Sequence, residues 1–328
     1  MAGNVWVLAE QWRGEVSEIT YEVLALGSEL AMALGVKLQA VLLGHRMESL
    51  AETLGKADGV LYVDHAALEE PTAEAQGAAL SQLVKEGQPH SVLIPLTNVS
   101  LGVEALIAAE LQLPVVNFCE DLRVVERRLQ ARCLLYGGKM EVLVRALREP
   151  VIFGIPPGTR PAEKGRAARV PALEEVAVTF PEAPAVRFTK YIEPEAGDVD
   201  ITKQDVLVAV GRGIQTQDNI ALAEELAQAL GGAVCGSRPV IDQGWLPLSR
   251  QVGKSGLTVK PKLYIAAGVS GAPEHVEGMK NASLIIAINT DPHAPIFSLA
   301  HYGIAEDVLE VLPALTEEVH KAIRKKAG

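Results

Sequence analysis

The first part of the chain alternates between short continuous apolar runs and longer stretches whose apolar residues recur at helical spacing. Continuous runs of about four to eight residues are typical of strands buried on both faces of a sheet. We expect strands over Asn4–Ala9, Val36–Leu43, Gly59–Val63 and Ser91–Leu96, and helices over Val16–Leu34, Pro71–Glu86 and Leu101–Leu111. Strands that alternate with helices in this way predict a parallel sheet with helices on both faces.

After Pro114 the pattern changes to strand-like runs with no helix between them. These runs are Val115–Phe118, Leu122–Val125, Leu129–Leu135, Glu141–Leu147 and Val151–Ile155. They predict antiparallel additions to the first sheet and a first domain that covers residues 1–158. Residues 159–200 are rich in Pro, Glu and Ala, so we expect an extended linker with one short strand, Val186–Tyr191.

Residues 201–328 return to the alternation of strands and helices and form the second expected domain. The expected strands are Asp205–Val210, Ala233–Cys235, Leu263–Ala267, Leu284–Ile288 and Val308–Val311. Helices are expected over Asn219–Leu230 and Ile296–His301, before a last helix capped by Thr316. The predicted fold class is therefore α/β, with two domains that are each a largely parallel, Rossmann-like sheet with helices on both faces, the first with antiparallel additions.

The stretch Leu263–His275 has the pattern of a strand, a tight turn and the start of a helix. Gly268 and Gly271 allow the backbone to approach a ligand closely, and Ser270 is a candidate for the residue that caps the helix. A helix that opens directly after a strand directs unpaired N–H groups toward one point, where phosphate binds well. An ordinary strand–turn–helix connection without a ligand is the alternative for this stretch alone.

Polar side chains follow several strands of the second domain. They are Arg212, Ser237, Arg238, Ser270, His275 and Asn289. Ligands of open α/β sheets bind outside the carboxyl ends of the strands, so we expect these side chains and the polar loop 251–256 at one site. Together they suit a ligand with phosphates, a ribose and a ring with hydrogen-bonding edges. Taken singly they are also explained as surface charges or turn formers, and that is the preferred interpretation of Ser237 and Asp307.

Composition narrows the function classes. The chain has 328 residues and a net charge of −11, and it has no basic stripe, so nucleic acid is not an expected partner. We find no secretory signal, no apolar segment long enough to span a bilayer, and no zinc-ligand spacing around Cys119, Cys133 or Cys235. These features predict a cytoplasmic protein with reduced thiols and no metal site. The sequence also lacks a phosphate loop, a Ser/His/Asp set and a His-Glu-x-x-His motif, which argues against hydrolytic or metal chemistry.

Two long motifs connect the second domain to a known family. They are Pro261–Ala272 with Glu274–Lys280, and Ile288–Phe297 with Tyr302–Ile304. With these motifs residues 201–328 resemble the FAD-binding half of the electron transfer flavoprotein alpha subunit. Gly211–Gly213 and Gly236–Arg238 stand where that family has further flavin contacts, and the first domain matches more loosely through Val7–Glu10.

The resemblance implies an electron carrier that binds FAD in an extended form and has no catalytic residues of its own. It implies a heterodimer with an electron transfer flavoprotein beta subunit. Dehydrogenases such as acyl-CoA dehydrogenases would supply the electrons, and an acceptor such as a quinone oxidoreductase would receive them. Two alternatives stay open: a subunit of an electron-bifurcating, NADH-oxidising complex, and a nucleotide-binding scaffold without flavin.

The resemblance also implies roles for individual residues. Ser270 and Gly271 would hold the pyrophosphate, and Asn289 and Asp307 the adenosine end. Ser255 would bond flavin N5, and His275 the pyrimidine edge near C2=O. Arg212, Ser237 and Arg238 would lie along the flavin and its phosphates, where Arg238 and His275 would favour negative charge on the reduced ring. The full set expected to contact the cofactor is Arg212, Ser237, Arg238, Val252, Gly253, Lys254, Ser255, Ser270, Gly271, Ala272, Pro273, Glu274, His275, Asn289, Asp307 and Val308.

Three positions differ from the family pattern. Lys254 and Glu274 each stand where relatives carry an amide, and we expect their side chains to approach each other so that the added charges largely cancel. The resemblance implies a nucleotide-hydrolase-like fold for residues 1–158. There, Thr97–Gly102 lacks the Gly-Arg-Asp of relatives, so no nucleotide is expected in the first domain.

Overall fold

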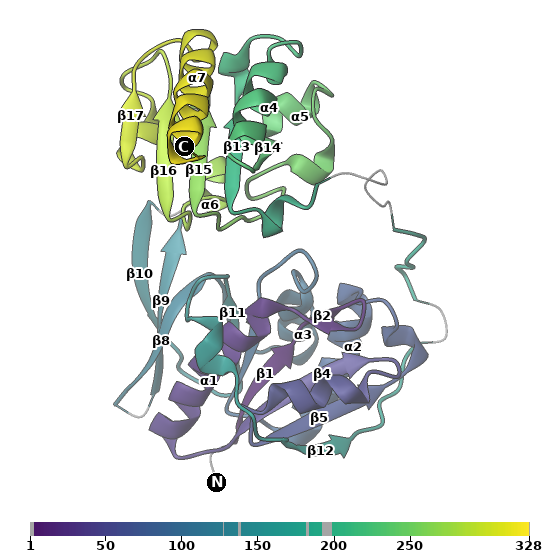
Figure 1. Ribbon diagram of the computed structural model, residues 1–328. Helices are drawn as coiled ribbons and strands as arrows, with labels where there is room; N and C mark the ends of the chain where they lie inside the picture. Colours follow the sequence, from purple (N-terminus) through teal and green to yellow (C-terminus); the bar gives the residue numbers. More distant parts are fainter. Residues whose placement is uncertain (1–2, 127, 137–138, 182–183, 192–198, 328) are drawn as a thin grey trace. The chain divides into compact units, whose positions relative to one another are not determined.

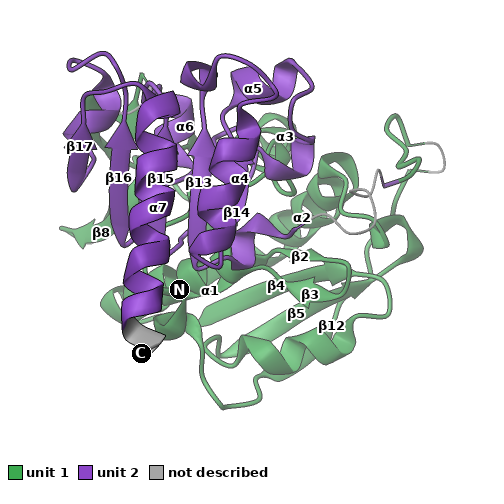
Figure 2. Cartoon of the chain, turned by 45° about the horizontal axis from the view of Figure 1, so that its top comes forward, with its two compact units in different colours: residues 1–190 green, residues 191–328 purple. Residues whose placement is uncertain are grey.

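The computed structural model describes residues 3–126, 128–136, 139–181, 184–191 and 199–327. The chain forms two compact units, residues 1–190 (unit 1) and residues 191–328 (unit 2), which are coloured separately in Figure 2. Each unit has a parallel sheet and its own buried core. The predicted α/β class is confirmed.

Unit 1 is built on a seven-stranded parallel sheet with the order β12-β5-β4-β1-β6-β11-β7. Its strands are β1 (Val5–Ala9), β4 (Leu38–Gly44), β5 (Gly59–Asp64), β6 (Ser91–Pro95), β7 (Val115–Val116), β11 (Val151–Ile155) and β12 (Ala172–Glu175). Its helices are α1 (Glu18–Leu34), α2 (Ala73–Gly87) and α3 (Val103–Leu111), and β2 (Gln11–Trp12) pairs with β3 (Glu15–Val16) (Figure 1).

The two faces of this sheet have separate cores. Val5 and Val7 of β1 pack with α1, whereas Trp6 and Leu8 pack with α2 and α3. Alternate residues of one strand therefore serve opposite layers, which explains why the strand is a continuous apolar run.

The antiparallel strands of unit 1 form a sheet of their own, which corrects the expectation that they extend the first sheet. Its strands are β8 (Cys119–Val125), β9 (Arg128–Leu135) and β10 (Met140–Arg145). In β9 only alternate residues are buried, which suits a sheet with one face on the core. The flanking runs instead supply β7 and β11, which are parallel strands of the main sheet.

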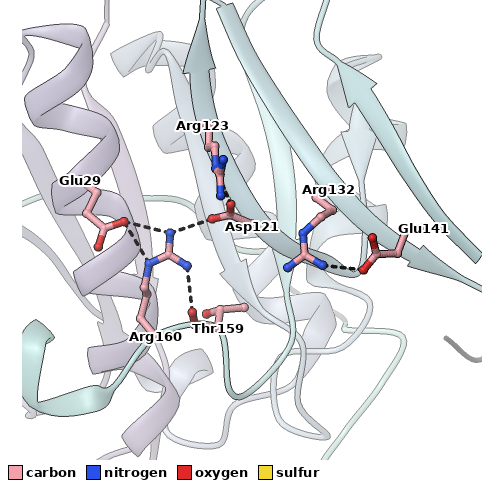
Figure 3. A network of polar contacts seen from close by, with 7 residues as sticks. All are labelled: Glu29, Asp121, Arg123, Arg132, Glu141, Thr159 and Arg160. Atoms are coloured by element: carbon pink, nitrogen blue, oxygen red, sulfur yellow. Dashed lines mark hydrogen bonds and ion pairs between the residues drawn. The ribbon is translucent and has the colours of Figure 1, made fainter.

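An ion-pair network joins the antiparallel sheet to α1 (Figure 3). Arg160 Nη2 lies 2.7 Å from Asp121 Oδ1 on β8 and 2.9 Å from Glu29 Oε2 on α1. Arg123 Nε lies 2.7 Å from the other carboxylate oxygen of Asp121. Burial opposes the charge of Asp121, but the hydrogen bonds from Arg160 and Arg123 hold the pKa of Asp121 below its ordinary value. The network therefore fixes where the small sheet meets α1.

The segment expected as a linker begins as part of unit 1. Residues 172–175 form β12 at the edge of the main sheet, and Val176, Val178 and Phe180 pack against its core. These three residues occupy every second position, a strand-like pattern that the Pro- and Glu-rich composition obscures. The expected strand Val186–Tyr191 is not formed, and residues 192–198 lie outside the described ranges.

Unit 2 has a five-stranded parallel sheet with the order β14-β13-β15-β16-β17. Its strands are β13 (Val206–Val210), β14 (Ala233–Gly236), β15 (Leu263–Ala267), β16 (Leu284–Ile288) and β17 (Tyr302–Ile304), and its helices are α4 (Ile220–Ala229), α5 (Arg238–Asp242), α6 (Pro273–Glu277) and α7 (Val308–Ala327). Helices α4 and α7 share one core with the sheet (Figure 1). The strand order reverses direction between β13 and β15, which is where ligands bind in open sheets.

The end of unit 2 differs from the prediction. Val308–Val311, expected as the last strand, is the first turn of α7, and the last strand is Tyr302–Ile304. Thr316 lies inside the helix, where its hydroxyl donates to the Leu312 carbonyl at 2.8 Å. Pro313 interrupts the helical pattern in the sequence, so the run before it was predicted as a strand and the helix was expected to begin only at Thr316. In the structure one helix continues through Pro313.

Candidate cofactor site

A cavity of about 1060 Å³ lies in unit 2 at the carboxyl ends of β13 to β16. All of the residues expected to contact the cofactor line it except Gly271 and Pro273. It is at the upper end of the range of about 300–1,000 Å³ that is usual for small-molecule and cofactor sites. The strand ends thus meet at one place, as the sequence predicted.

The turns after β13 and β15 touch through their backbones. Gly211 N donates to Ala267 O at 2.9 Å, and Gly213 N donates to Gly268 O at 3.1 Å. A Cβ on Gly211 would lie 2.2 Å from Gly268 O. Gly268 itself has φ +66°, in the left-handed region that favours glycine. Side chains at these positions would push apart the two turns that form the floor of the cavity.

The turn after β15 is longer than expected. The residue before α6 is Ala272, so Ser270 does not cap that helix but lies in the turn. Ser270 O accepts a hydrogen bond from Ile296 N at 3.1 Å. Gly271 is buried against the backbone of Ile296, which explains why it faces away from the cavity.

Asn289 and Asp307 both have partners within unit 2. Asn289 Nδ2 donates to Val269 O at 3.0 Å, which ties the end of β16 to the turn after β15. Asp307 Oδ1 accepts from Leu309 N at 2.9 Å and so caps α7. Its Oδ2 lies 3.3 Å from Gln215 Nε2. Both residues line the cavity while holding its wall in place.

The polar loop is closed on itself and attached to α6. Gln251, which is 3% exposed, donates from Nε2 to Ser255 Oγ at 2.9 Å. Lys254 N donates to Glu274 O at 2.7 Å. The backbones of these two atypical residues are therefore adjacent, and the approach of their side chains stays a prediction.

His275 is a buried polar residue in the wall of the cavity. Its side chain is 6% exposed, and its Nε2 lies 2.9 Å from the hydroxyl of Tyr264 on β15. Burial lowers the pKa of His275 to about 4, and the nearby backbone of Val252 offsets only part of that effect. The imidazole is therefore neutral at pH 7. Within the described residues its buried Nδ1 has no side-chain or backbone partner of good hydrogen-bond geometry.

Several lining residues were outside the predicted set. They are Gly211, Gly213, Gln215, Pro239, Gln251, Gly268, Val269 and Thr290. The glycines belong to turns that the sequence singled out, and Gln251 opens the predicted polar loop. No sequence pattern pointed to Gln215, because its approach to Asp307 depends on the pairing of segments far apart in the chain.

Family comparisons cover both units. Residues 5–181 match the electron transfer flavoprotein domain, and residues 200–280 match the electron transfer flavoprotein FAD-binding domain. A curated relative, electron transfer flavoprotein subunit alpha of Thermoanaerobacterium thermosaccharolyticum, is 36% identical over 97% of this chain and 98% of its own. The chain belongs to the electron transfer flavoprotein alpha-subunit family. The predicted resemblance and the prediction of FAD are thereby confirmed at the level of the family.

Other relatives of this electron transfer flavoprotein chain carry related names. Protein FixB of Azotobacter vinelandii is 35% identical over 99% of this chain and 94% of its own. The acryloyl-CoA reductase electron transfer subunit beta of Anaerotignum propionicum is 34% identical over 96% and 95%. Among the described residues, no helix combines the length and the apolar character needed to cross a bilayer.

Proposed function

We propose that this electron transfer flavoprotein subunit holds FAD in the cavity of unit 2 and carries electrons from a dehydrogenase to a redox acceptor. The observation that carries the proposal is the convergence of four strand ends, the polar loop and His275 on one cavity within the matched FAD-binding region. When bound, the flavin supplies the electron-transfer chemistry, and the protein contributes binding, orientation and electrostatics.

The residues present fit a dinucleotide. The turn after β15 is tied to its neighbours by Gly268 N, which donates to Ile288 O at 2.8 Å, and by the carbonyls of residues 268–270, which accept. The N–H groups of residues 269–272 are not needed for these bonds. Those N–H groups and Ser270 would hold the pyrophosphate. Asp307 would meet the ribose of the adenosine end, because a carboxylate suits paired hydroxyl groups.

The ring end of the cavity has both charged and neutral donors. Arg238 is mostly exposed, with 69% of its side chain accessible, and Arg212 is exposed beside the same cavity. Ser255, oriented by Gln251, would donate to flavin N5. Because His275 is neutral, it would act on the ring as a hydrogen-bond donor. Any stabilisation of the reduced, negatively charged ring by a positive side chain would then come from Arg238.

We further infer that the chain works as one half of a heterodimer with an electron transfer flavoprotein beta subunit. Dehydrogenases such as acyl-CoA dehydrogenases would donate the electrons, and a quinone oxidoreductase is the class of acceptor that suits such a carrier. The alternative of an NADH-oxidising, electron-bifurcating complex gains no support over this proposal from the relatives' names.

Flavin analysis of the protein co-purified with its partner subunit tests the proposal. We expect FAD that is released on denaturation and a visible flavin spectrum that dehydrogenase and substrate bleach. An Arg238→Ala variant should retain FAD but show a more negative reduction potential. Protein that carries no flavin with the partner present would refute the proposal.

A further inference from the structure

Unit 1 contains a pair of buried thiols that the proposed function does not use. Cys119 on β8 and Cys133 on β9 lie opposite each other in the antiparallel sheet, and their sulfur atoms are 3.7 Å apart. Cys119 is 0% exposed and Cys133 is 1% exposed, and neither takes part in a disulfide. Two thiols at this separation form a disulfide on oxidation if the backbone around them permits the bond.

The backbone of the pair suits a disulfide. Next to the pair, Leu134 N donates to Phe118 O at 3.2 Å. Hydrogen-bonded and non-hydrogen-bonded pairs alternate along antiparallel strands, so Cys119 and Cys133 form a non-hydrogen-bonded pair, in which the Cα atoms are typically about 4.5 Å apart. A disulfide joins residues whose Cα atoms are about 4.4–6.8 Å apart. The bond therefore requires the two side chains to turn toward each other, without a large shift of the strands.

The pair is also close to the exposed end of the small sheet. Two residues further along β9, on the same face, Leu135 is 38% exposed, and Met140 opposite it on β10 is 50% exposed. The register of the ladder shifts between Cys119 and Asp121. A strand end beside such an irregularity opens more readily than the middle of a sheet, so a small uncharged oxidant has a route to the sulfur atoms.

The hydrogen bonds of the pair indicate which sulfur reacts first. Cys119 donates to Val116 O at 3.2 Å, so in the neutral pair the Cys133 thiol donates to the Cys119 sulfur. When Cys133 loses its proton, the proton of Cys119 turns from Val116 O to the thiolate. This hydrogen bond lowers the pKa of Cys133, although burial opposes the charge. Because the thiolate is the nucleophile, Cys133 attacks first and Cys119 second.

We propose that Cys119 and Cys133 are a redox-active dithiol, which hydrogen peroxide converts into a cross-strand disulfide and which small thiols restore. The Cys133 thiolate attacks one peroxide oxygen, so the O–O bond breaks, a sulfenic acid forms and hydroxide leaves. The Cys119 sulfur then attacks the sulfenic sulfur, the S–O bond breaks, and the departing hydroxide takes the Cys119 proton and leaves as water. In total the pair loses two electrons and two protons, and the peroxide becomes two molecules of water.

Thiol counting on the folded, full-length chain tests this proposal, with or without FAD. The protein is treated with hydrogen peroxide at pH 7, then denatured in the presence of a maleimide and digested with trypsin. We expect two of the three thiols to escape labelling and a cross-link to join the peptides 86–123 and 133–139. Dithiothreitol should restore both thiols. Cys235 is the internal control, because it is also 0% exposed and should keep its label.

Two variants separate the pair from general oxidation. Cys119→Ala should give no cross-link, whereas Cys235→Ala should form it as the wild type does. The wild-type digest decides the question even if the Cys119→Ala chain does not fold. Wild-type protein that keeps all three thiols would overturn the proposal, and so would loss of the Cys235 label as fast as the other two. Cys119 and Cys133 oxidised to sulfonic acids without a cross-link would also overturn it.

Discussion

Both units have a parallel sheet whose strand order reverses beside its first strand. They differ in the residue that follows this strand, which is a buried carboxylate in unit 1 and a glycine in unit 2. In unit 1, β1 is followed by Glu10, which is 3% exposed and whose carboxylate accepts from Thr97 Oγ1 and lies 2.6 Å from Ser100 Oγ. In unit 2, β13 is followed by Gly211, whose backbone touches the turn after β15.

The difference shows why similar sheets need not have similar sites. The Glu10 carboxylate lies just after β1 and accepts from the nearby hydroxyls, and a carboxylate at this position opposes a phosphate. The glycine turns of unit 2 leave room and supply backbone N–H groups. We therefore continue to expect no nucleotide in unit 1, for a reason that lies in Glu10 as well as in the missing Gly-Arg-Asp.

The largest expected effect comes from adding a side chain where the two glycine turns of unit 2 are in backbone contact. In Gly268→Ala the added Cβ would lie 2.6 Å from the backbone of Gly213, so we expect loss of FAD and a destabilisation of several kcal/mol. Gly231→Ala is the control, because Gly231 has a similar φ of +69° with open space around it. That change should cost only about 1–2 kcal/mol by chemical denaturation and leave FAD bound. Equal losses in the two variants would show that the contact is unimportant.

The next effect is a dependence of stability on pH that comes from His275 in unit 2. The pKa of His275 is about 4 in the folded chain, against about 6.5 in an unfolded one, so the unfolded chain binds more protons between these values. Stability should therefore fall as pH is lowered from 6.5 to 4, by about 3 kcal/mol from this group. Denaturation of the cofactor-free protein at several pH values should show a flatter profile for His275→Gln than for wild type. Parallel profiles would contradict the assignment.

A smaller effect is expected from the buried carboxylate of Glu10 in unit 1. Glu10→Ala leaves the hydroxyls of Thr97 and Ser100 without their shared acceptor, which should cost about 1–3 kcal/mol. Because Glu10 belongs to unit 1, the FAD content of the purified complex should not change. Thermal unfolding and flavin quantification measure both quantities. Loss of flavin would show that the two sites are not independent.

The smallest effect on stability is expected at Arg238. Its side chain is 69% exposed and its ion pair with Asp242 spans 3.4 Å, so Arg238→Ala should change the free energy of unfolding by less than about 0.5 kcal/mol. The reduction potential should nevertheless become more negative, because a cation beside the ring is removed. Potentiometric titration against wild type measures this shift. An unchanged potential would remove Arg238 from the proposed set.

Local patterns were sufficient for most of the fold and for the place of the site. Continuous apolar runs marked the buried parallel strands, because such strands are covered on both faces. Glycines and polar residues just after those runs located the cavity, because parallel strands bring their carboxyl ends to one edge. Arg212, Arg238 and His275 were therefore placed at the cavity without knowledge of their contacts.

The remaining features of the fold and of the site depend on contacts between residues that are far apart in the sequence. Whether residues 119–145 extend one sheet or form another depends on which strands pair, and residues 172–175 join unit 1 only because β5 offers an edge. The first turn of α7 was taken for a strand because three apolar residues within four positions fit either element, and only the structure shows that the helix continues through Pro313. The charge state of His275 likewise comes from burial beside Tyr264, a neighbour that sequence spacing does not reveal.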